Sequence, residues 1–449
     1  MTILAVDIGT TAMKLGVYLA TGADPALLEQ AAIWSQDYEI NTYNNGLFAD
    51  IEPEKWRDAL ARGCRELATW MPAVDAVALS GTTPGLTAMD RKGEALLPAI
   101  LMLDQRSRRQ AAEIIARIGL ERLLADTANM PVAGGCSLAS ILWIRENTPD
   151  LYKKAACFGH SNTYIARWLT GELAIDPSSA SLTALYNTTA NDLTWHSGIA
   201  AELGIELDRL PRLIPCSASA GRVRESIAGS LGLSRRPRVV IGGNDAVLAA
   251  YSAGCREPGQ VINVNGTCEI TLVCLGRCYP SCNYNIRAHV LPGRWLTLYV
   301  MNAGGIALEW FRSVFCSEMS ERQFFDDFLP RAIDQGLVRE SPVRYVPFLM
   351  GSRYTQEALS AQFLGISQKT TREELAAAIV RGLAEYQREH LKEISLEVPL
   401  ASVINVTGGA LNPALIRAKQ RWMRGCDYVQ IEQSSLRGAA LLAQEHLAG

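Results

Sequence analysis

The chain has 449 residues, 48% of them hydrophobic and 20% charged, which allows two or three globular domains with cores of their own. A formal net charge of −3 without a dominant Lys/Arg block does not favour nucleic-acid binding or a membrane-surface face. Because no run of 18 apolar residues occurs and a strand begins almost at once, we expect neither a membrane span nor a signal peptide, and a cytoplasmic protein.

The first predicted strand, 3–6, leads into the turn Asp7-Ile8-Gly9-Thr10-Thr11, and a second strand follows from Lys14. Glycine permits a tight turn close to a ligand, and the following backbone N–H groups and threonine hydroxyls can hold phosphate oxygens. Asp7 is placed at the strand end, where one carboxylate can hold Mg²⁺ directly or through water. A single turn of this kind is usually only a turn, but a second glycine-threonine turn and a later Gly-Gly loop in the chain favour a phosphate site here, with Asp7 as a magnesium ligand.

Strands are also predicted over 74–79 and 99–103. The first ends in the breaker-rich turn Ser80-Gly81-Thr82-Thr83-Pro84-Gly85, and the second ends at Asp104. A long helix is predicted from its cap Ser107 to about residue 124, and shorter helices from about 137 and 161.

A short buried strand, 239–241, ends in Gly242-Gly243-Asn244-Asp245-Ala246 and is followed by a helix rich in small residues. Asp245 should project from the end of this strand, where a carboxylate can act as a general base. The alternative is that Asp245 only caps the helix, which is a common role for aspartate.

The second half repeats this pattern. Strand 261–264 runs into Asn265-Gly266-Thr267. Thr371 and Glu374 form a capping-box pattern at the start of a helix that runs toward residue 394. Strand 403–406, the loop 407–412, a helix from Pro413 and a last helix from about 434 complete the chain. Alternating strands and helices predict α/β domains over 1–248 and 249–449.

Eleven cysteines, an odd number, are mostly placed in apolar segments, as expected of small buried side chains in a reducing compartment. The one cluster is Cys274, Cys278 and Cys282, whose spacing of four lacks the C-x-x-C pair usual for zinc or iron–sulfur sites. A metal site at this cluster is therefore the less favoured interpretation. The sequence G-x-x-x-x-G-K-[ST] is absent, so a P-loop kinase is excluded.

The motif at Asp7–Thr11 resembles the first phosphate motif of the sugar kinase/actin/heat-shock ATPase superfamily. Further stretches narrow the resemblance to the FGGY carbohydrate kinases, of the xylulokinase or pentulose kinase kind, over nearly the whole chain. These are 79–86 with Asp104-x-Arg106, 242–246, Asn302-Ala303-Gly304-Gly305, 407–412 and Arg437-Gly438-Ala439-Ala440.

The resemblance implies two actin-like (ribonuclease H-like) α/β domains with a central interdomain cleft, and ATP-dependent phosphorylation of a small sugar or polyol. It implies Asp245 as the base that accepts the proton of the sugar hydroxyl, and Asp7 as a required residue near Mg²⁺. The nucleotide side then comprises Thr10, Thr11, Lys14, Gly266, Thr267, Gly304, Gly305, Gly408, Gly409 and Asn412. For Asn412, a cap on the helix from Pro413 is at least as good an interpretation as a ligand contact. A homodimer is compatible with the resemblance.

The sugar side departs from the family pattern. Thr82-Thr83-Pro84 stands where xylulokinase-like members carry Gln-Met-His and glycerol kinases carry Gln-Arg-Glu. Because Pro84 offers no side-chain donor or acceptor, a substrate hydrogen bond made there must be lost or moved. Asp104 is either part of the sugar pocket or half of a structural ion pair with Arg106. A ketopentose such as xylulose is the expected acceptor, and gluconate, glycerol or another polyol is the alternative.

Two other classes stay open. One is a nucleotide-driven conformational protein without a small-molecule acceptor, and the other is a sugar-sensing or inactive relative, suggested by the altered turn at Thr82–Pro84.

Overall fold

The computed structural model describes residues 1–21, 24, 27–339, 341–352, 354, 359–408, 412–423, 425–431 and 434–448. The chain forms two compact units. Unit 1 comprises Met1–Gly254, Asn285–Leu296 and Gln433–Gly449, and unit 2 comprises Cys255–Tyr284 and Thr297–Glu432. The sequence pattern predicted contiguous halves; in space, two segments of the second half pack with the first.

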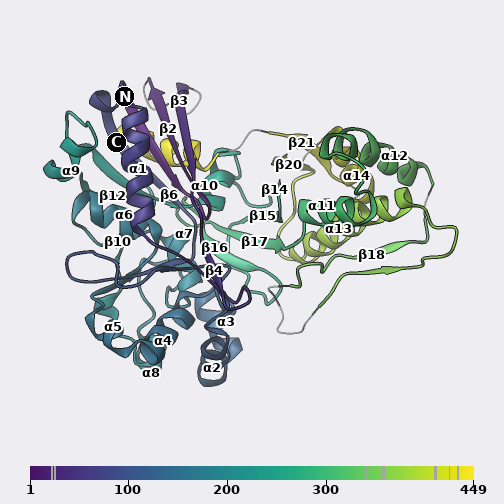
Figure 1. Cartoon of the computed structure of the whole chain (residues 1–449). Helices are drawn as coiled ribbons and strands as arrows, with labels where there is room; N and C mark the ends of the chain where they lie inside the picture. The colour runs from purple at the N-terminus through teal and green to yellow at the C-terminus, as the bar shows by residue number, and fades with distance from the viewer. Residues whose placement is uncertain are drawn as a thin grey trace. The chain divides into compact units, whose positions relative to one another are not determined.

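Unit 1 is built on a six-stranded mixed sheet with the order β12-β13-β6-β1-β2-β3 (Figure 1). Its strands are β1 (Thr2–Ile8), β2 (Ala12–Ala20), β3 (Leu28–Asp37), β6 (Val74–Gly81), β12 (Ser219–Arg222) and β13 (Arg238–Asn244). The first three run antiparallel as a meander, whereas β1, β6 and β13 are parallel neighbours. The carboxyl ends of β1, β6 and β13 therefore lie at one edge of the sheet.

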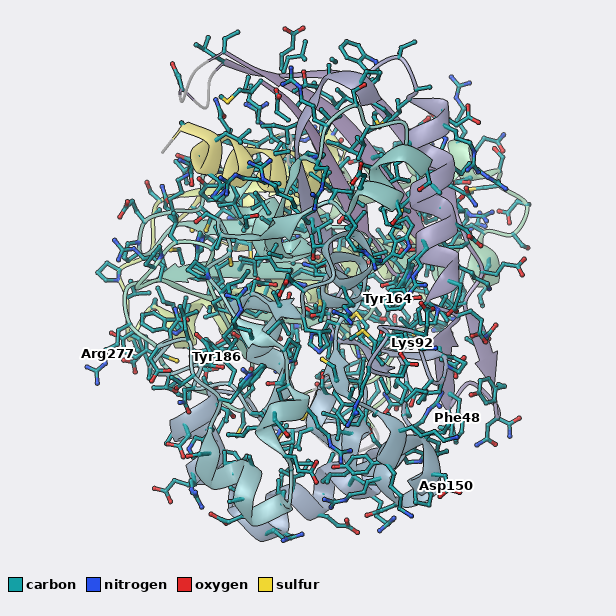
Figure 2. The ribbon with its side chains drawn as sticks, turned by 90° about the vertical axis from the view of Figure 1, so that its left-hand side faces the viewer. Phe48, Lys92, Asp150, Tyr164, Tyr186 and Arg277 are labelled. Carbon is teal, nitrogen blue, oxygen red and sulfur yellow. The ribbon has the colours of Figure 1, made fainter. Side chains whose placement is uncertain are left out.

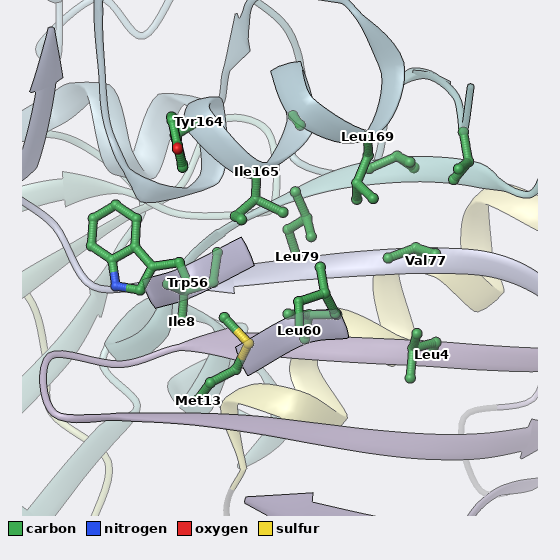
Figure 3. Close-up of a cluster of buried hydrophobic side chains, with 14 of the residues drawn as sticks. Leu4, Ile8, Met13, Trp56, Leu60, Val77, Leu79, Tyr164, Ile165 and Leu169 are labelled. Atoms are coloured by element: carbon green, nitrogen blue, oxygen red, sulfur yellow. The ribbon is translucent and has the colours of Figure 1, made fainter. Parts of the chain in front are cut away.

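Helices cover both faces of this sheet. Leu4 and Ile8 belong to one cluster of buried side chains together with Trp56 of α1 (Glu54–Glu66) and Ile165 of α6 (Ser161–Thr170), all labelled in Figure 3. The opposite face of β1 and β6 contacts α15 (Ser435–Ala448), which also packs on α10 (Asp245–Ser252). Because both faces are covered, every residue of β1 is buried.

A second layer of unit 1 holds a five-stranded sheet with the order β4-β5-β8-β7-β9. Its elements are β4 (Asn41–Tyr43), β5 (Phe48–Ile51), β7 (Gly85–Met89), β8 (Ala99–Leu101) and β9 (Cys157–Gly159), with helices α2 (Arg108–Ile118), α3 (Leu120–Thr127), α4 (Ser137–Asn147), α5 (Pro149–Lys154) and α8 (Ser197–Leu203). The single helix predicted over 107–124 is wrong. Gly119 adopts φ +87° and separates α2 from α3, and Ser107 makes no side-chain cap.

Short elements complete unit 1. Its η elements, in which the helical turns are tighter than in an α-helix, are η2 (Met71–Ala73), η3 (Ser181–Thr183) and η4 (Leu207–Arg209). The remainder are β10 (Ala174–Ile175), α7 (Pro177–Ala180), β11 (Arg212–Leu213), α9 (Glu225–Ser230) and β16 (Asn285–Ala288).

The sheet of unit 2 contains the strand order β17-β15-β14-β20-β21. These strands are β14 (Val261–Asn265), β15 (Glu269–Leu275), β17 (Trp295–Met301), β20 (Val403–Thr407) and β21 (Asp427–Gln430). Helices α11 (Gly305–Phe315), α12 (Leu329–Val338), α13 (Arg372–Ile394) and α14 (Pro413–Met423), together with η5 (Gln323–Phe328), a short π-helix, form its main apolar cluster. A two-stranded sheet joins β18 (Arg344–Val346) to β19 (Gln362–Leu364).

Local signals in unit 2 agree with its structure. The predicted capping box is confirmed, since the Glu374 N–H donates to Thr371 Oγ1 and the Thr371 N–H donates to the Glu374 carboxylate. The predicted helix start at Pro413 is also confirmed. No helix in the described part of the chain is both long enough and apolar enough to cross a membrane.

The two main sheets share one topology. In unit 1, β1 pairs antiparallel with β2 and parallel with β6. In unit 2, β14 pairs antiparallel with β15 and parallel with β20, which in turn pairs parallel with β21. The repeat predicted from the two glycine-threonine turns therefore extends to the surrounding strands.

Candidate active site

Asp7 lies at the end of β1, beside Ser80 on β6. The Ser80 hydroxyl donates to Asp7 Oδ1 at 2.6 Å. Asp7 is only 8% exposed, and no described residue hydrogen-bonds its Oδ2 oxygen. One oxygen of the carboxylate is thus fixed, and the other is available to a water or a cation.

Asp245 begins α10, directly after β13. Gly242 forms a bulge in β13 with φ +65°, and a Cβ at this position would lie 1.6 Å from the Leu79 carbonyl oxygen. Such bulges redirect the residues that follow them. The helix cap is Asn244, whose side-chain oxygen accepts from the Val247 N–H, so Asp245 is not needed as the N-cap.

The Asp245 carboxylate is half-buried and held through Oδ1, which accepts from Asn244 Nδ2 at 2.8 Å and from the Ala246 N–H at 2.7 Å. Removal from water raises the pKa of Asp245 to about 6, and the nearby Asp7 carboxylate contributes to the increase. A carboxylate with a pKa near 6 suits a general base that works near neutral pH.

The turn after β6 is tightly engaged. The hydroxyls of Thr10 and Thr82 are hydrogen-bonded at 3.0 Å, and the bond between Thr83 and Pro84 is cis. Thr83 Oγ1 accepts from Asn244 Nδ2 at 3.0 Å and from Arg287 Nη1 at 2.9 Å. The predicted substrate residues Thr82 and Thr83 are both buried, and the Thr83 hydroxyl is used within the protein.

Asp104 is fully buried and bonded through both oxygens. Oδ1 accepts from the Arg106 N–H, and Oδ2 accepts from the Ala49 N–H and from Arg106 Nε, all at 2.7–2.8 Å. The Arg106 guanidinium also pairs with Asp50 and lies over the ring of Phe48, which is labelled in Figure 2. These contacts favour the structural ion pair among the two interpretations of Asp104.

The first turn is anchored by a tyrosine. The Tyr38 hydroxyl donates to the carbonyl oxygens of Gly9 and Ala12. The Tyr38 N–H donates to the Thr11 carbonyl oxygen at 2.9 Å. Lys14 is exposed and lies opposite Asp7 in the β1–β2 register. The turn is thus fixed by the hydroxyl and the N–H of Tyr38, the residue directly after β3.

Backbone hydrogen bonds anchor the second turn, and the Cys268 thiol adds a contact to the Asn302 carbonyl oxygen at 3.4 Å. The N–H groups of Gly304 and Gly305 donate to the carbonyl oxygens of Thr267 and Gly266 at 3.0 and 2.9 Å. A Cβ at Gly304 would lie 2.7 Å from the Glu269 nitrogen, so the turn and the start of α11 approach too closely for a side chain. Behind the turn, Lys419 forms a buried ion pair with Glu269.

A pocket of about 900 Å³ lies on unit 2 next to this turn. It brings together four predicted nucleotide residues, Gly266, Thr267, Gly305 and Asn412, with apolar walls from Ile306 and Phe325. Its volume lies within the range of small-ligand sites. Asn412 Oδ1 also accepts from the Leu415 N–H at 2.9 Å and so caps α14.

Gly408 and Gly409 are the predicted nucleotide-side glycines of the segment 407–412. Gly408 has φ +117°, and a Cβ there would lie 2.0 Å from the Asn265 carbonyl oxygen. The conformation and the close approach both require glycine. Gly409 lies outside the described residues.

Among the described residues, no group of three or more His, Cys, Asp or Glu side chains is placed to hold a metal ion. Cys274 and Cys278 are buried, and Cys282 is half-buried. A magnesium ion would therefore depend on a single carboxylate such as Asp7 together with water and phosphate oxygens, which is a usual arrangement for this ion.

Comparison with known families identifies both halves of the chain. Residues 2–252 match the model of the N-terminal domain of the FGGY family of carbohydrate kinases, and residues 263–444 match the model of its C-terminal domain. The chain belongs to the FGGY family of carbohydrate kinases. The fold of FGGY kinases, with two actin-like domains, and their ATP-dependent action on small sugars agree with the predictions from the sequence.

Individual FGGY kinases resemble the chain at modest identity. A xylulose kinase of Staphylococcus xylosus is 24% identical over 417 residues, covering 91% of this chain and 83% of that protein. The crystal structure of a xylulose kinase from Rhodospirillum rubrum matches with a TM-score of 0.88 at 22% identity, covering 99% and 89% of the two chains. That of a gluconate kinase from Lactobacillus acidophilus matches equally, with a TM-score of 0.88, 20% identity and the same coverages.

Sequence reasoning missed two residues of this site. Arg287 had no assigned role, although an arginine inside the short apolar segment Ile286-Arg287-Ala288 is an unusual residue for a buried strand. Tyr38 gave no signal, because its partners are backbone carbonyl oxygens that carry no side-chain pattern.

Proposed function

We propose that this FGGY kinase transfers the γ-phosphoryl group of ATP to a hydroxyl of a small sugar, most simply a ketopentose such as xylulose, with Asp245 as the general base. The observation that carries this proposal is the Asp245 carboxylate, held through Oδ1 with a pKa raised to about 6. Its role is to accept the proton of the attacking hydroxyl.

Further roles are divided between the two units. On unit 2, the pocket beside Gly266 and Thr267 binds the nucleotide, with Ile306 and Phe325 as apolar walls suited to a purine. On unit 1, Asp7 holds Mg²⁺, directly or through water. Bound magnesium supplies neutralisation of phosphate charge. Ser80 orients the Asp7 carboxylate for this purpose through its 2.6 Å hydrogen bond.

The sugar specificity is open to a different acceptor. The hydroxyl of Thr83 is occupied by Arg287 and Asn244, so it is not free to replace the polar contacts that other family members make from this turn. Sites that hydrogen-bond hydroxyls discriminate strongly among polyols. A gluconate or another polyol is therefore the second candidate, and the resemblance to a gluconate kinase structure at an equal TM-score supports keeping it.

The test measures ADP formation with a panel of pentuloses, hexuloses, polyols and aldonic acids. We expect sugar-dependent turnover, and a loss of about 10²- to 10⁴-fold in kcat for Asp245→Asn with ATP binding retained. The matched control is Asp150→Asn, an exposed aspartate in α5 of the same unit, which should keep full turnover.

Three results would contradict the proposal. Near-normal turnover of Asp245→Asn would show that Asp245 is not the general base. ADP release that no acceptor stimulates would indicate a nucleotide-driven protein. If no ADP forms with any acceptor, the protein would be a sensing or inactive relative.

A further inference from the structure

Arg287 is a buried arginine of β16, only 2% exposed, in the segment of the second half that packs within unit 1. A buried guanidinium is costly unless its donors are satisfied. Nη1 donates to Thr83 Oγ1 at 2.9 Å and to the Ser178 carbonyl oxygen at 3.2 Å, and Nη2 donates to the Thr83 carbonyl oxygen at 3.1 Å. The guanidinium therefore holds both the hydroxyl and the carbonyl oxygen of Thr83.

The same Thr83 hydroxyl is the point of contact with the catalytic strand. Asn244 Nδ2 donates to Thr83 Oγ1 at 3.0 Å and to Asp245 Oδ1 at 2.8 Å. Two donors thus fix the Thr83 oxygen, and a single amide group links that oxygen to the carboxylate. The chain of hydrogen bonds runs from the guanidinium through Thr83 and Asn244 to Asp245.

A second contact holds the same strand end from the side of α7. The Asn244 N–H donates to Ser178 Oγ at 2.9 Å, and the Ser178 hydroxyl donates to the buried Asp176. Arg287 reaches this segment as well, through the Ser178 carbonyl oxygen. Asn244 is therefore fixed through its backbone by Ser178 and through its side chain by Thr83, and Arg287 touches both supports.

We propose that Arg287 is a positioning residue for phosphoryl transfer: it holds Thr83 and, through Asn244, sets the orientation of the Asp245 carboxylate. The inference rests on the proposed role of Asp245 as the base. A misplacement of a catalytic group by about 1 Å costs on the order of 10²-fold in rate. Loss of the Arg287 hydrogen bonds should therefore lower kcat while the base itself stays in place.

Arginine is required here for its shape as well as its charge. Its planar fork presents several donors in fixed directions, whereas a lysine ammonium on a flexible stem cannot hold the hydroxyl and the carbonyl of Thr83 in the same way. The positive charge of Arg287 also opposes the increase in the pKa of Asp245 that burial and the Asp7 carboxylate cause.

The experiment is a double-mutant cycle between Arg287→Ala and Thr83→Val, with kcat, the KM for ATP and Tm measured for each variant. We expect each single variant to lose about 10- to 100-fold in kcat with the KM for ATP nearly unchanged, and the double variant to lose little more than either. Added guanidinium ion at millimolar concentration should restore part of the kcat of Arg287→Ala only. Arg238→Met is the matched control, since Arg238 is exposed on the strand that carries Asn244, and it should behave as the parent.

A folded Arg287→Ala variant with unchanged kcat, or losses that simply add to those of Thr83→Val, would overturn the positioning role. If Arg287→Ala does not fold, Arg287→Lys takes its place, and a kcat equal to that of the parent would count against the proposal. The two proposals fail separately. Turnover by Asp245→Asn refutes the role of Asp245 as the general base. An inactive Asp245→Asn together with a fully active Arg287→Ala refutes only the positioning role of Arg287.

Discussion

The hairpin turn of unit 1 and that of unit 2 follow strands with the same neighbours, yet the residues around them differ. The first turn, Gly9–Thr11, is anchored by the Tyr38 hydroxyl and lies beside the strand ends that carry Asp7 and Ser80. The second, Gly266–Cys268, is anchored by the N–H groups of Gly304 and Gly305 and borders a pocket of about 900 Å³.

This difference separates what the topology provides from what the side chains provide. The parallel pairing of β1 with β6, and of β14 with β20, places strand ends and their loops together in both units. Carboxylates at these ends make unit 1 suited to proton transfer and cation binding, whereas glycines make unit 2 suited to close contact with a ligand. Under the proposed function, the two units would therefore use one topology for two kinds of chemistry.

The largest expected effect concerns the ion pair behind the second turn, for which the described residues show no counterpart behind the first. Lys419→Met leaves Glu269, 5% exposed, as an unpaired buried charge and should lower the free energy of unfolding by about 3–5 kcal/mol. Urea denaturation measures this loss. Lys14→Met, at an exposed lysine after the first turn, is the control and should change stability by less than about 0.5 kcal/mol.

The double variant Lys419→Met with Glu269→Gln sharpens this test, because it removes both charges. It should recover much of the lost stability. Equal destabilisation by the single and the double variant would show that the cost comes from packing and not from an unpaired charge.

Gly266 of the second turn and Gly304, which anchors this turn from the start of α11, should respond differently to alanine. At Gly304 a Cβ would meet backbone atoms at 2.7 and 2.8 Å, so Gly304→Ala should cost about 1–3 kcal/mol and raise the KM for ATP. At Gly266 the nearest atom to a Cβ is 3.6 Å away. Gly266→Ala should therefore keep the parent Tm, and any rise in its KM for ATP would report direct contact with the nucleotide. A lower Tm for Gly266→Ala than for Gly304→Ala would reverse the assignment of the two positions.

The pH dependence should distinguish the units. Because Asp245 must be ionised to accept a proton and its pKa is raised to about 6, kcat/KM for the sugar should fall about tenfold per pH unit below that value. The affinity of unit 2 for ATP should not show this decrease at low pH.

The stability of the protein should change with pH in the opposite direction to kcat/KM. The folded protein binds the Asp245 proton more tightly than the unfolded chain does, so ionising Asp245 lowers the free energy of unfolding as the pH rises from about 4 to 6. A decrease in kcat/KM below about pH 6 that persists in Asp245→Asn would show that another group titrates.

The smallest effect is expected at the anchor of the first turn. Tyr38→Phe removes the hydroxyl that serves the carbonyl oxygens of Gly9 and Ala12 and should cost about 1 kcal/mol. Thermal unfolding measures it, with Tyr279→Phe in unit 2 as a control of the same chemical change. A neutral Tyr38→Phe would mean that the first turn keeps its stability without the tyrosine hydroxyl.

Local signals in the sequence predicted much of this fold. Alternating buried strands and breaker residues predicted β1, β6, β13, β14 and β20, and the Thr371–Glu374 pair predicted the start of α13, because these depend on neighbours in the chain. The break at Gly119 was missed, since apolar residues continue at helical spacing on both sides of it. Glycine within such a pattern indicates a break only when its backbone angle is known.

The site was predictable to the extent that it is carried by motifs. Asp7, Asp245 and the glycine turns could be singled out as candidates because the proposed phosphoryl transfer calls for those residue types at strand ends. Arg287 could not, because its partners Thr83 and Ser178 are more than a hundred residues away in the chain. Long-range contacts of this kind follow from the packing of β16 with unit 1, which no local pattern encodes.

The placement of α15 within unit 1 has a consequence for biosynthesis. Strands β1 and β6 lack one of their covering layers until Ser435–Ala448 has left the ribosome, although the segment up to Gly254 is made far earlier. At ordinary rates of translation the roughly 180 intervening residues take about 10 to 40 s. During that interval an apolar sheet face stands uncovered, and transiently exposed hydrophobic surface of this kind favours aggregation.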